Sequence, residues 1–120
     1  MGKFQAQKDF PCRVDETFRY CISGLERVGF GIKKSYIDTG EIEALYPPLN
    51  LFGIDWTFGI GLIAHVMPLE GGHSTVMVEA WRIRFLNPTL GELLQPGPEK
   101  LVTDFFATVE FIIERRKQAG

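Results

Sequence analysis

The sequence predicts an α+β two-layer sandwich, in which an antiparallel sheet carries both helices on one face. Two segments, one near each end of the chain, have the apolar period of an amphipathic helix. Between them, short segments of alternating apolar and polar residues are joined by glycine-containing turns, which is typical of β-hairpins. Consecutive hairpins form an antiparallel sheet that helices can cover on one side. The expected order is β-α-β-β-β-β-α, in one domain of residues 1–120.

Composition excludes several classes of function. The chain is 45% hydrophobic and 23% charged, which suits a globular domain with its own core. A formal charge of -2 offers no basic face for a phosphate backbone, so we expect no nucleic-acid partner. Cys12 and Cys21 lack CxxC spacing, so we expect neither a zinc site nor a disulfide, and we expect no cofactor. The start MGKFQAQKDF has no apolar signal segment, which predicts a cytoplasmic chain.

The first elements are a strand and a helix. Residues 4–10 alternate loosely and predict a strand, and the apolar period changes to helical near Asp15. We expect Asp15 to cap the free N-H groups of the first turn and Gly29 to end the helix in a left-handed conformation. Cys21 lies on the apolar side of this helix, which favours a small buried residue over a nucleophile.

Two hairpins follow the helix. The turn Asp38-Thr39-Gly40 joins segments 30–37 and 41–46, and Pro47 and Pro48 end the second of these strands. A second turn around Gly71 and Gly72 leads into a last strand that we expect to reach Phe85.

Residues 49–68 are nearly as long as a membrane helix and contain one charge, Asp55. Their side chains separate with a period of two into an apolar set that includes Trp56 and Phe58 and a smaller, partly polar set that includes Gly59 and Gly61. This alternation predicts a strand with two unlike faces, so we expect no membrane span.

The register between the two long strands decides which side chains share a face. If Gly71 and Gly72 are the two loop residues, the facing pairs are Phe58 with Phe85, Ile60 with Ile83, Leu62 with Trp81, Gly61 with Arg82 and Gly59 with Arg84. A shift by one residue would move both arginines into the apolar layer, at a cost of several kcal/mol for each unpaired buried charge. We therefore expect the first register, although it turns Glu79 inward unless a bulge intervenes.

The last segments are a connector and a helix. Residues 87–97 contain two prolines and two glycines but also three leucines, which a solvated loop rarely needs. Pro98 suits the first position of a helix, and an apolar face then runs from Leu101 to Ile113.

This element order and the long final helix resemble the helix-grip group, which includes START and pollen-allergen-like ligand-binding domains, and also TATA-binding-protein-like domains. The resemblance covers nearly the whole chain and rests on element order alone. The extra short helix and additional strands of pollen allergens have no counterpart in this sequence. The resemblance implies a ligand site between the sheet and the last helix.

Aromatic and apolar residues from the sheet, the connector and the last helix are candidates for such a site or for plain core packing. We expect a non-enzymatic module that binds an apolar or amphipathic small molecule, with tryptophans as wall residues and Arg82 or Arg84 as a possible anchor. The candidate ligand-binding residues are Tyr46, Trp56, Phe58, Trp81, Arg82, Arg84, Leu90, Leu93 and Phe105.

The glycines at 59 and 61 carry two alternative interpretations. They allow sheet curvature with arginine stems covering the bare backbone, or they leave a shallow site where Arg82 and Arg84 hold an anion beside Asp55 and Thr57.

Two other functions remain open. The glycine face or the connector leucines could form a homo-oligomer or partner interface. An enzyme would need His65, Glu79 or an arginine to converge in a pocket, and sequence spacing gives no such convergence for His65 or His73. We therefore expect neither catalytic nor metal-binding residues.

Overall fold

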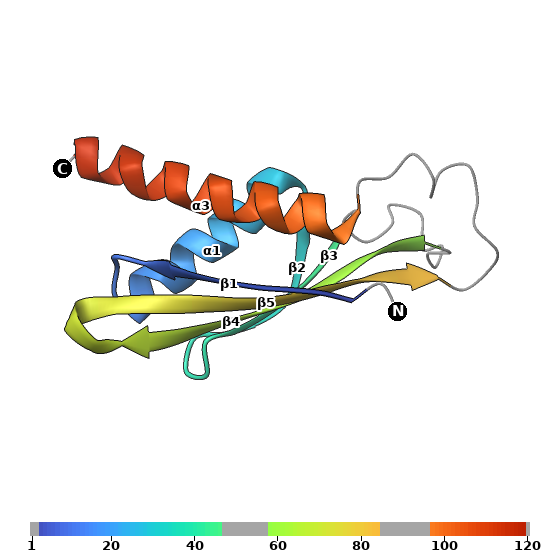
Figure 1. Cartoon of the computed structure of the whole chain (residues 1–120), viewed down its shortest axis with the longest axis horizontal. Coiled ribbons are helices and arrows are strands. Elements are labelled where there is room, and N and C mark those ends of the chain that lie inside the picture. Colours follow the sequence, from blue (N-terminus) through green and yellow to red (C-terminus); the bar gives the residue numbers. More distant parts are fainter. Residues whose placement is uncertain (1–2, 47–57, 85–96, 120) are drawn as a thin grey trace.

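The computed structural model describes residues 3–46, 58–84 and 97–119. It forms two layers, a sheet and a pair of helices (Figure 1). In chain order the elements are β1 (Phe4–Phe10), α1 (Val14–Val28), β2 (Gly31–Tyr36), β3 (Glu41–Tyr46), β4 (Phe58–Leu69), the 3-10 turn η1 (Glu70–Gly72), β5 (His73–Arg84) and α3 (Pro98–Ala119).

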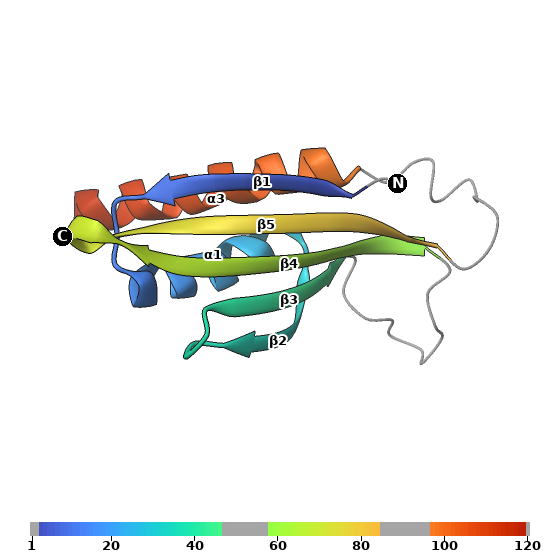
Figure 2. The same ribbon diagram turned by 60° about the horizontal axis from the view of Figure 1, so that its bottom comes forward.

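The five strands form one antiparallel sheet in the order β1-β5-β4-β3-β2. Figure 2 shows this order across the sheet, with both helices behind it on the same face. The predicted α+β sandwich is therefore confirmed. No helix in the part of the chain that the structure describes is long and apolar enough to cross a membrane.

The core lies between the sheet and the helices. Alternation along each strand turns one set of side chains toward the helices, and the apolar faces of α1 and α3 cover that set. The fully buried members with the largest side chains include Phe105, Leu25, Ile42, Ile60, Leu62, Val66, Val76, Val102 and Val109. Cys21 has no exposed surface, which agrees with its predicted place in the core.

The structure confirms the predicted end of helix α1 but not its predicted N-terminal cap. Gly29 ends it with a φ of 118°, and its N-H donates to the carbonyl of Leu25 at 3.1 Å, as predicted. The expected cap at Asp15 is wrong, because the helix begins at Val14 and Arg13 takes the cap position. Asp15 instead lies in the first turn, where its charge favours the helix dipole and its carboxylate is 3.6 Å from the Arg13 guanidinium.

Two buried hydroxyls tie α1 to the sheet. Ser74 Oγ donates to Thr17 Oγ1 at 2.6 Å, and neither side chain has exposed surface. A buried hydroxyl without a partner would cost about 1–3 kcal/mol, so this pair fixes how α1 sits against β5.

The turn between β4 and β5 contains one residue more than expected. Leu69 pairs with His73, so Glu70, Gly71 and Gly72 form the loop, and both glycines have a φ of 77°. The predicted loop contained only the two glycines. Because side chains alternate along a strand, the additional Glu70 shifts the register of the whole hairpin by one residue.

The predicted register is therefore wrong. Trp81 pairs with Gly61 and Arg82 with Ile60, so Trp81 lies on the outer face of the sheet and Arg82 on the face toward the helices. Glu79 pairs with Ile63 and also lies on the outer face, and no bulge is needed to turn it out. The shift that we expected to be too costly is the one observed, and it places the Arg82 side chain in the apolar layer.

Candidate functional site

Three side chains form a row across the sheet on its helix-facing side. Tyr46 of β3 pairs with Ile60 of β4, and Ile60 pairs with Arg82 of β5. Since neighbouring strands lie about 4.8 Å apart, Tyr46 and Arg82 are roughly 10 Å apart at the backbone. The sequence proposed both as ligand-binding residues, and the fold places them in one row.

Arg82 is the polar member of this row. Among the residues that the structure describes, its Nη1 is buried and has no hydrogen-bond partner. Its Nη2 lies close to Gly97, where a Cβ would be 3.5 Å away. Gly97 directly precedes helix α3, so the guanidinium lies beside a helix N-terminus, and both favour an anion.

Tyr46 closes the other end of the row. Its ring centroid is 5.5 Å from that of Phe30, and a Cβ at Gly29 would lie 3.0 Å from its ring. Glycine after α1 therefore lets the chain pass close to the tyrosine ring, which remains half-buried.

Farther along α3 the layer between helix and sheet is filled by side chains. Phe105 has no exposed surface, and its ring centroid is 5.4 Å from that of Phe106. A Cβ at Gly24 of α1 would approach Val109 Cγ2 to 2.8 Å, so the two helices are in close contact here. Phe105 thus belongs to the packed interior.

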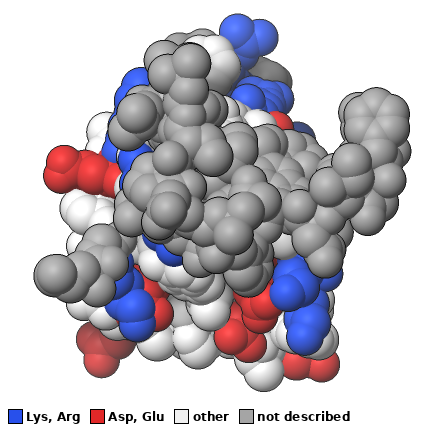
Figure 3. All heavy atoms as spheres, turned by 90° about the vertical axis from the view of Figure 1, so that its right-hand side faces the viewer, with Lys and Arg blue, Asp and Glu red and all other residues white. Residues whose placement is uncertain are grey.

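Other predicted site residues are not in this row. Phe58 and Arg84 form the last strand pair at this end of the sheet, and their side chains are outside the described part. Trp56, Leu90 and Leu93 also lie outside the described residues, as do Asp55 and Thr57. Figure 3 views this end of the molecule and shows acidic and basic side chains together around its rim.

On the outer face of the sheet, the residue that covers the bare glycine backbone is not the one expected. A Cβ at Gly61 would lie 2.7 Å from Cε2 and Cζ2 of Trp81, so the indole ring covers this glycine. The predicted cover by arginine stems is wrong at this position, and so is an anion site that uses Arg82 on the glycine face, because Arg82 points to the other side.

His65 and Glu79 line one shallow hollow on the outer face, of about 470 Å³, together with Ile63, Met67 and Met77. Each polar group already has a partner. His65 Nε2 is 2.9 Å from the Thr39 carbonyl oxygen, and Glu79 Oε2 accepts from Gln5 at 2.8 Å and pairs with Lys3 at 3.5 Å. The two residues therefore share a hollow without forming an acid-base pair.

The described residues contain no cluster of three side chains that could hold a metal ion. Burial raises the pKa of the Cys21 thiol to about 12, which keeps it protonated near neutral pH. Burial, and secondly the Glu16 carboxylate, also raise the pKa of Cys12. Neither thiol has the environment of a nucleophile.

Solved structures with a similar fold include the di-domain ARO/CYC BexL from the BE-7585A biosynthetic pathway, with a TM-score of 0.59 and 9% identity over 95% of this chain. This chain spans about half of that one, 47% of its length. A conserved protein from Geobacillus kaustophilus gives 0.53 at 10% identity, with 94% of this chain and 95% of that chain covered. Ara h 8.0201 gives 0.47 at 11% identity, covering 93% of this chain and 97% of that chain.

No family model and no curated protein matches the sequence. The identities are low, so these similarities concern the fold alone. The two structures with TM-scores above 0.5 support the overall fold that the five-stranded antiparallel sheet and two helices form. The chain has the helix-grip architecture.

Proposed function

We propose that this chain is a non-enzymatic module that binds an amphipathic small molecule between the sheet and the beginning of α3. The observation that carries the proposal is the Arg82 side chain, whose Nη1 is buried without a described partner in the apolar layer of the fold. A carboxylate or another anion at this nitrogen would complete its hydrogen bonding.

The energetics favour an anionic group there. Arg82 is half-buried, and a buried guanidinium nitrogen without a partner lowers stability, so an apolar residue of similar size would be less costly. An anionic ligand would offset this cost, because charge-assisted hydrogen bonds to a guanidinium in a poorly solvated site are strong. The N-terminus of α3 beside Gly97 adds to the same positive potential.

The remainder of the ligand would be apolar. Ile60 lies between Arg82 and Tyr46 in the row, and Leu101 of the first turns of α3 belongs to the same buried core. A site of this kind, mostly apolar with one placed charge, is typical of small-molecule binding. Phe105 would support the inner end of the site, while Trp81, on the outer face, has no part in it.

Calorimetric titration with decanoate and with decanol tests the proposal. The wild-type chain should bind decanoate more tightly than decanol, because only the carboxylate can pair with Arg82. Arg82→Gln should lower the affinity for decanoate by about tenfold or more and leave decanol unchanged. Arg19→Gln, which changes an exposed arginine of α1, is the matched control and should bind both as the wild type does. Equal affinities of the wild-type chain for the two ligands, or an equal loss in both variants, would contradict an anchor at Arg82.

A second candidate function is a homo-oligomer formed through the outer face of the sheet. Met77 is 45% exposed there, and the half-buried side chains of Leu45, Ile63, Met67 and Ile83 lie around it and Trp81. β4 and β5 have 12 residues each, which gives a two-strand face of roughly 40 by 10 Å. That is about half of the 800 Å² per partner that a standard interface buries, so any dimer would also use β1 or β3.

Light scattering over a concentration series tests this second function. A dimer through the outer face should weaken when Met77 is changed to Lys and persist when Phe111, exposed on α3, is changed to Lys. A monomer at every concentration would exclude it and leave the ligand proposal untouched.

A further inference from the structure

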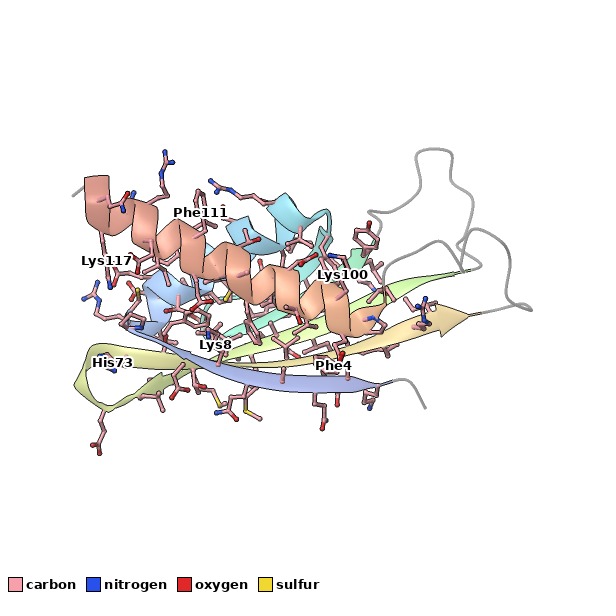
Figure 4. The ribbon with its side chains drawn as sticks, turned by 45° about the horizontal axis from the view of Figure 1, so that its top comes forward. Phe4, Lys8, His73, Lys100, Phe111 and Lys117 are labelled. Atoms are coloured by element: carbon pink, nitrogen blue, oxygen red, sulfur yellow. The ribbon has the colours of Figure 1, made fainter. Side chains whose placement is uncertain are left out.

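A groove between α1 and α3 has the composition of a second ligand site. It has a volume of about 580 Å³ and is lined by Arg27 and Val28 of α1 and by Asp104, Ala107, Thr108 and Phe111 of α3. A second hollow of about 380 Å³ adjoins it, and the two share Arg27 and Phe111. Figure 4 shows Phe111 on the side of α3 that faces away from the sheet, so this groove is distinct from the row at Arg82.

Three arginines line the second hollow, Arg27, Arg115 and Arg116. Among the ion pairs between described residues, none includes these three side chains. The carboxylate at the far end of the groove, Asp104, is held by Lys100 at 2.9 Å. The groove therefore has one positively charged end, whose three arginines form no ion pair with a described carboxylate.

Helix electrostatics explain part of this arrangement. Arg116 lies in the last turn of α3 and Arg27 in the last turn of α1, where positive charge favours the helix dipole. The dipole does not account for Phe111, which is 54% exposed and lines the same hollow as those two arginines. The Arg115 guanidinium is 5.7 Å from the centre of its ring, and Ile112 and Ala107 line the hollows beside it. An exposed aromatic ring within a basic cluster suits a ligand that is both anionic and apolar.

We propose that this groove binds a soluble phosphate monoester that carries an apolar or aromatic group. One carboxylate could engage one guanidinium bidentately, whereas a phosphate dianion has three terminal oxygens and a charge of about -2 for the three arginines. The organic group would then cover Phe111 and contact the lining side chains of Val28 and Ala107.

Nuclear magnetic resonance titration of the full chain with phenyl phosphate and with inorganic phosphate tests the site. Phenyl phosphate should give saturable shifts at the side-chain N-H groups of Arg27, Arg115 and Arg116 and at backbone amides 107–112. It should bind at least several times more tightly than inorganic phosphate, because only the ester covers Phe111. The Arg82 side chain should not respond, which separates this site from the one proposed between sheet and helix.

Two variants and a vesicle experiment complete the test. Arg27→Gln with Arg116→Gln should weaken phenyl phosphate binding by about tenfold or more, while Arg19→Gln, on the same helix as Arg27, should leave it unchanged. Equal affinities for the ester and the inorganic ion, no saturable shift, or an equal loss in the Arg19 variant would overturn the proposal. So would binding to vesicles containing phosphatidic acid in the absence of any response to phenyl phosphate, because the groove would then be a lipid-surface contact.

Discussion

Trp81 covers the backbone of Gly61, its partner on the neighbouring strand, so closely that any side chain at position 61 would meet the indole ring. A Cβ at Gly61 would lie 2.7 Å from two ring carbons and 2.9 Å from Nε1. Glycine in the middle of a strand is normally unfavourable, by roughly 0.5–1 kcal/mol relative to alanine. Here the missing side chain gives the tryptophan a place on the outer face of the sheet.

Gly61→Ala should therefore destabilise the fold by about 1–2 kcal/mol in urea unfolding, because the ring must move. In a Trp81→Ala background the same change should be neutral or stabilising, since the contact is gone and alanine restricts the unfolded chain. An equal cost in both backgrounds would show that Trp81 is not what excludes a side chain at position 61.

The hydroxyl pair of Thr17 and Ser74 should show an asymmetry between its two partners. Thr17→Val removes the acceptor and leaves the buried Ser74 hydroxyl without a partner, so unfolding in guanidinium should show a loss of about 1–3 kcal/mol. Ser74→Ala should cost less, because Thr17 Oγ1 can still donate to the Cys12 carbonyl oxygen at 3.5 Å. The double variant should cost less than the sum of the two changes, whereas additive costs would mean that the hydroxyls act independently.

Cys21 should make stability depend on pH in the alkaline range. The unfolded chain releases the thiol proton near the ordinary pKa of 9.0, but burial raises the folded pKa to about 12. Above pH 9 the unfolded state therefore binds fewer protons, and the free energy of unfolding falls as pH rises. The contribution is fully present below pH 9 and decreases by up to about 1.4 kcal/mol per pH unit above it.

This pH dependence is checked by the free energy of unfolding in urea of the wild type and of Cys21→Ala from pH 7 to 10.5. The difference between the two should be constant below pH 9 and should shrink above it. A constant difference across the whole range would contradict a protonated thiol in the core.

The place of Glu70 in the turn between β4 and β5 separates what the sequence could predict from what it could not. Period and turn residues were enough for the element types, the antiparallel sheet and the two helices on one face. The strand register needed the length of one turn, and glycines at 71 and 72 are compatible with a loop of two residues or three. A difference of one residue exchanges the faces of Trp81 and Arg82, so the predicted wall and anchor could not both be placed correctly.

The sequence identified Tyr46 and Arg82 as candidates by their chemistry but could not show that they share a row. Their proximity depends on two strand pairings, through Ile60, which lie far apart in the chain. The cost of a buried charge argued against the correct register. That cost applies to a charge without a partner, and the proposed ligand would be the partner.

The most direct test of the site at Arg82 is the free energy of unfolding of the wild type and of Arg82→Met, each with and without saturating decanoate. Without ligand, Arg82→Met should be more stable than the wild type by about 1 kcal/mol, since an apolar side chain replaces a half-buried guanidinium whose buried Nη1 has no hydrogen-bond partner. Decanoate should stabilise the wild type through binding to the folded state and should have a much smaller effect on the variant. A variant that is less stable than the wild type, together with equal stabilisation of both by decanoate, would contradict a ligand anchor at Arg82.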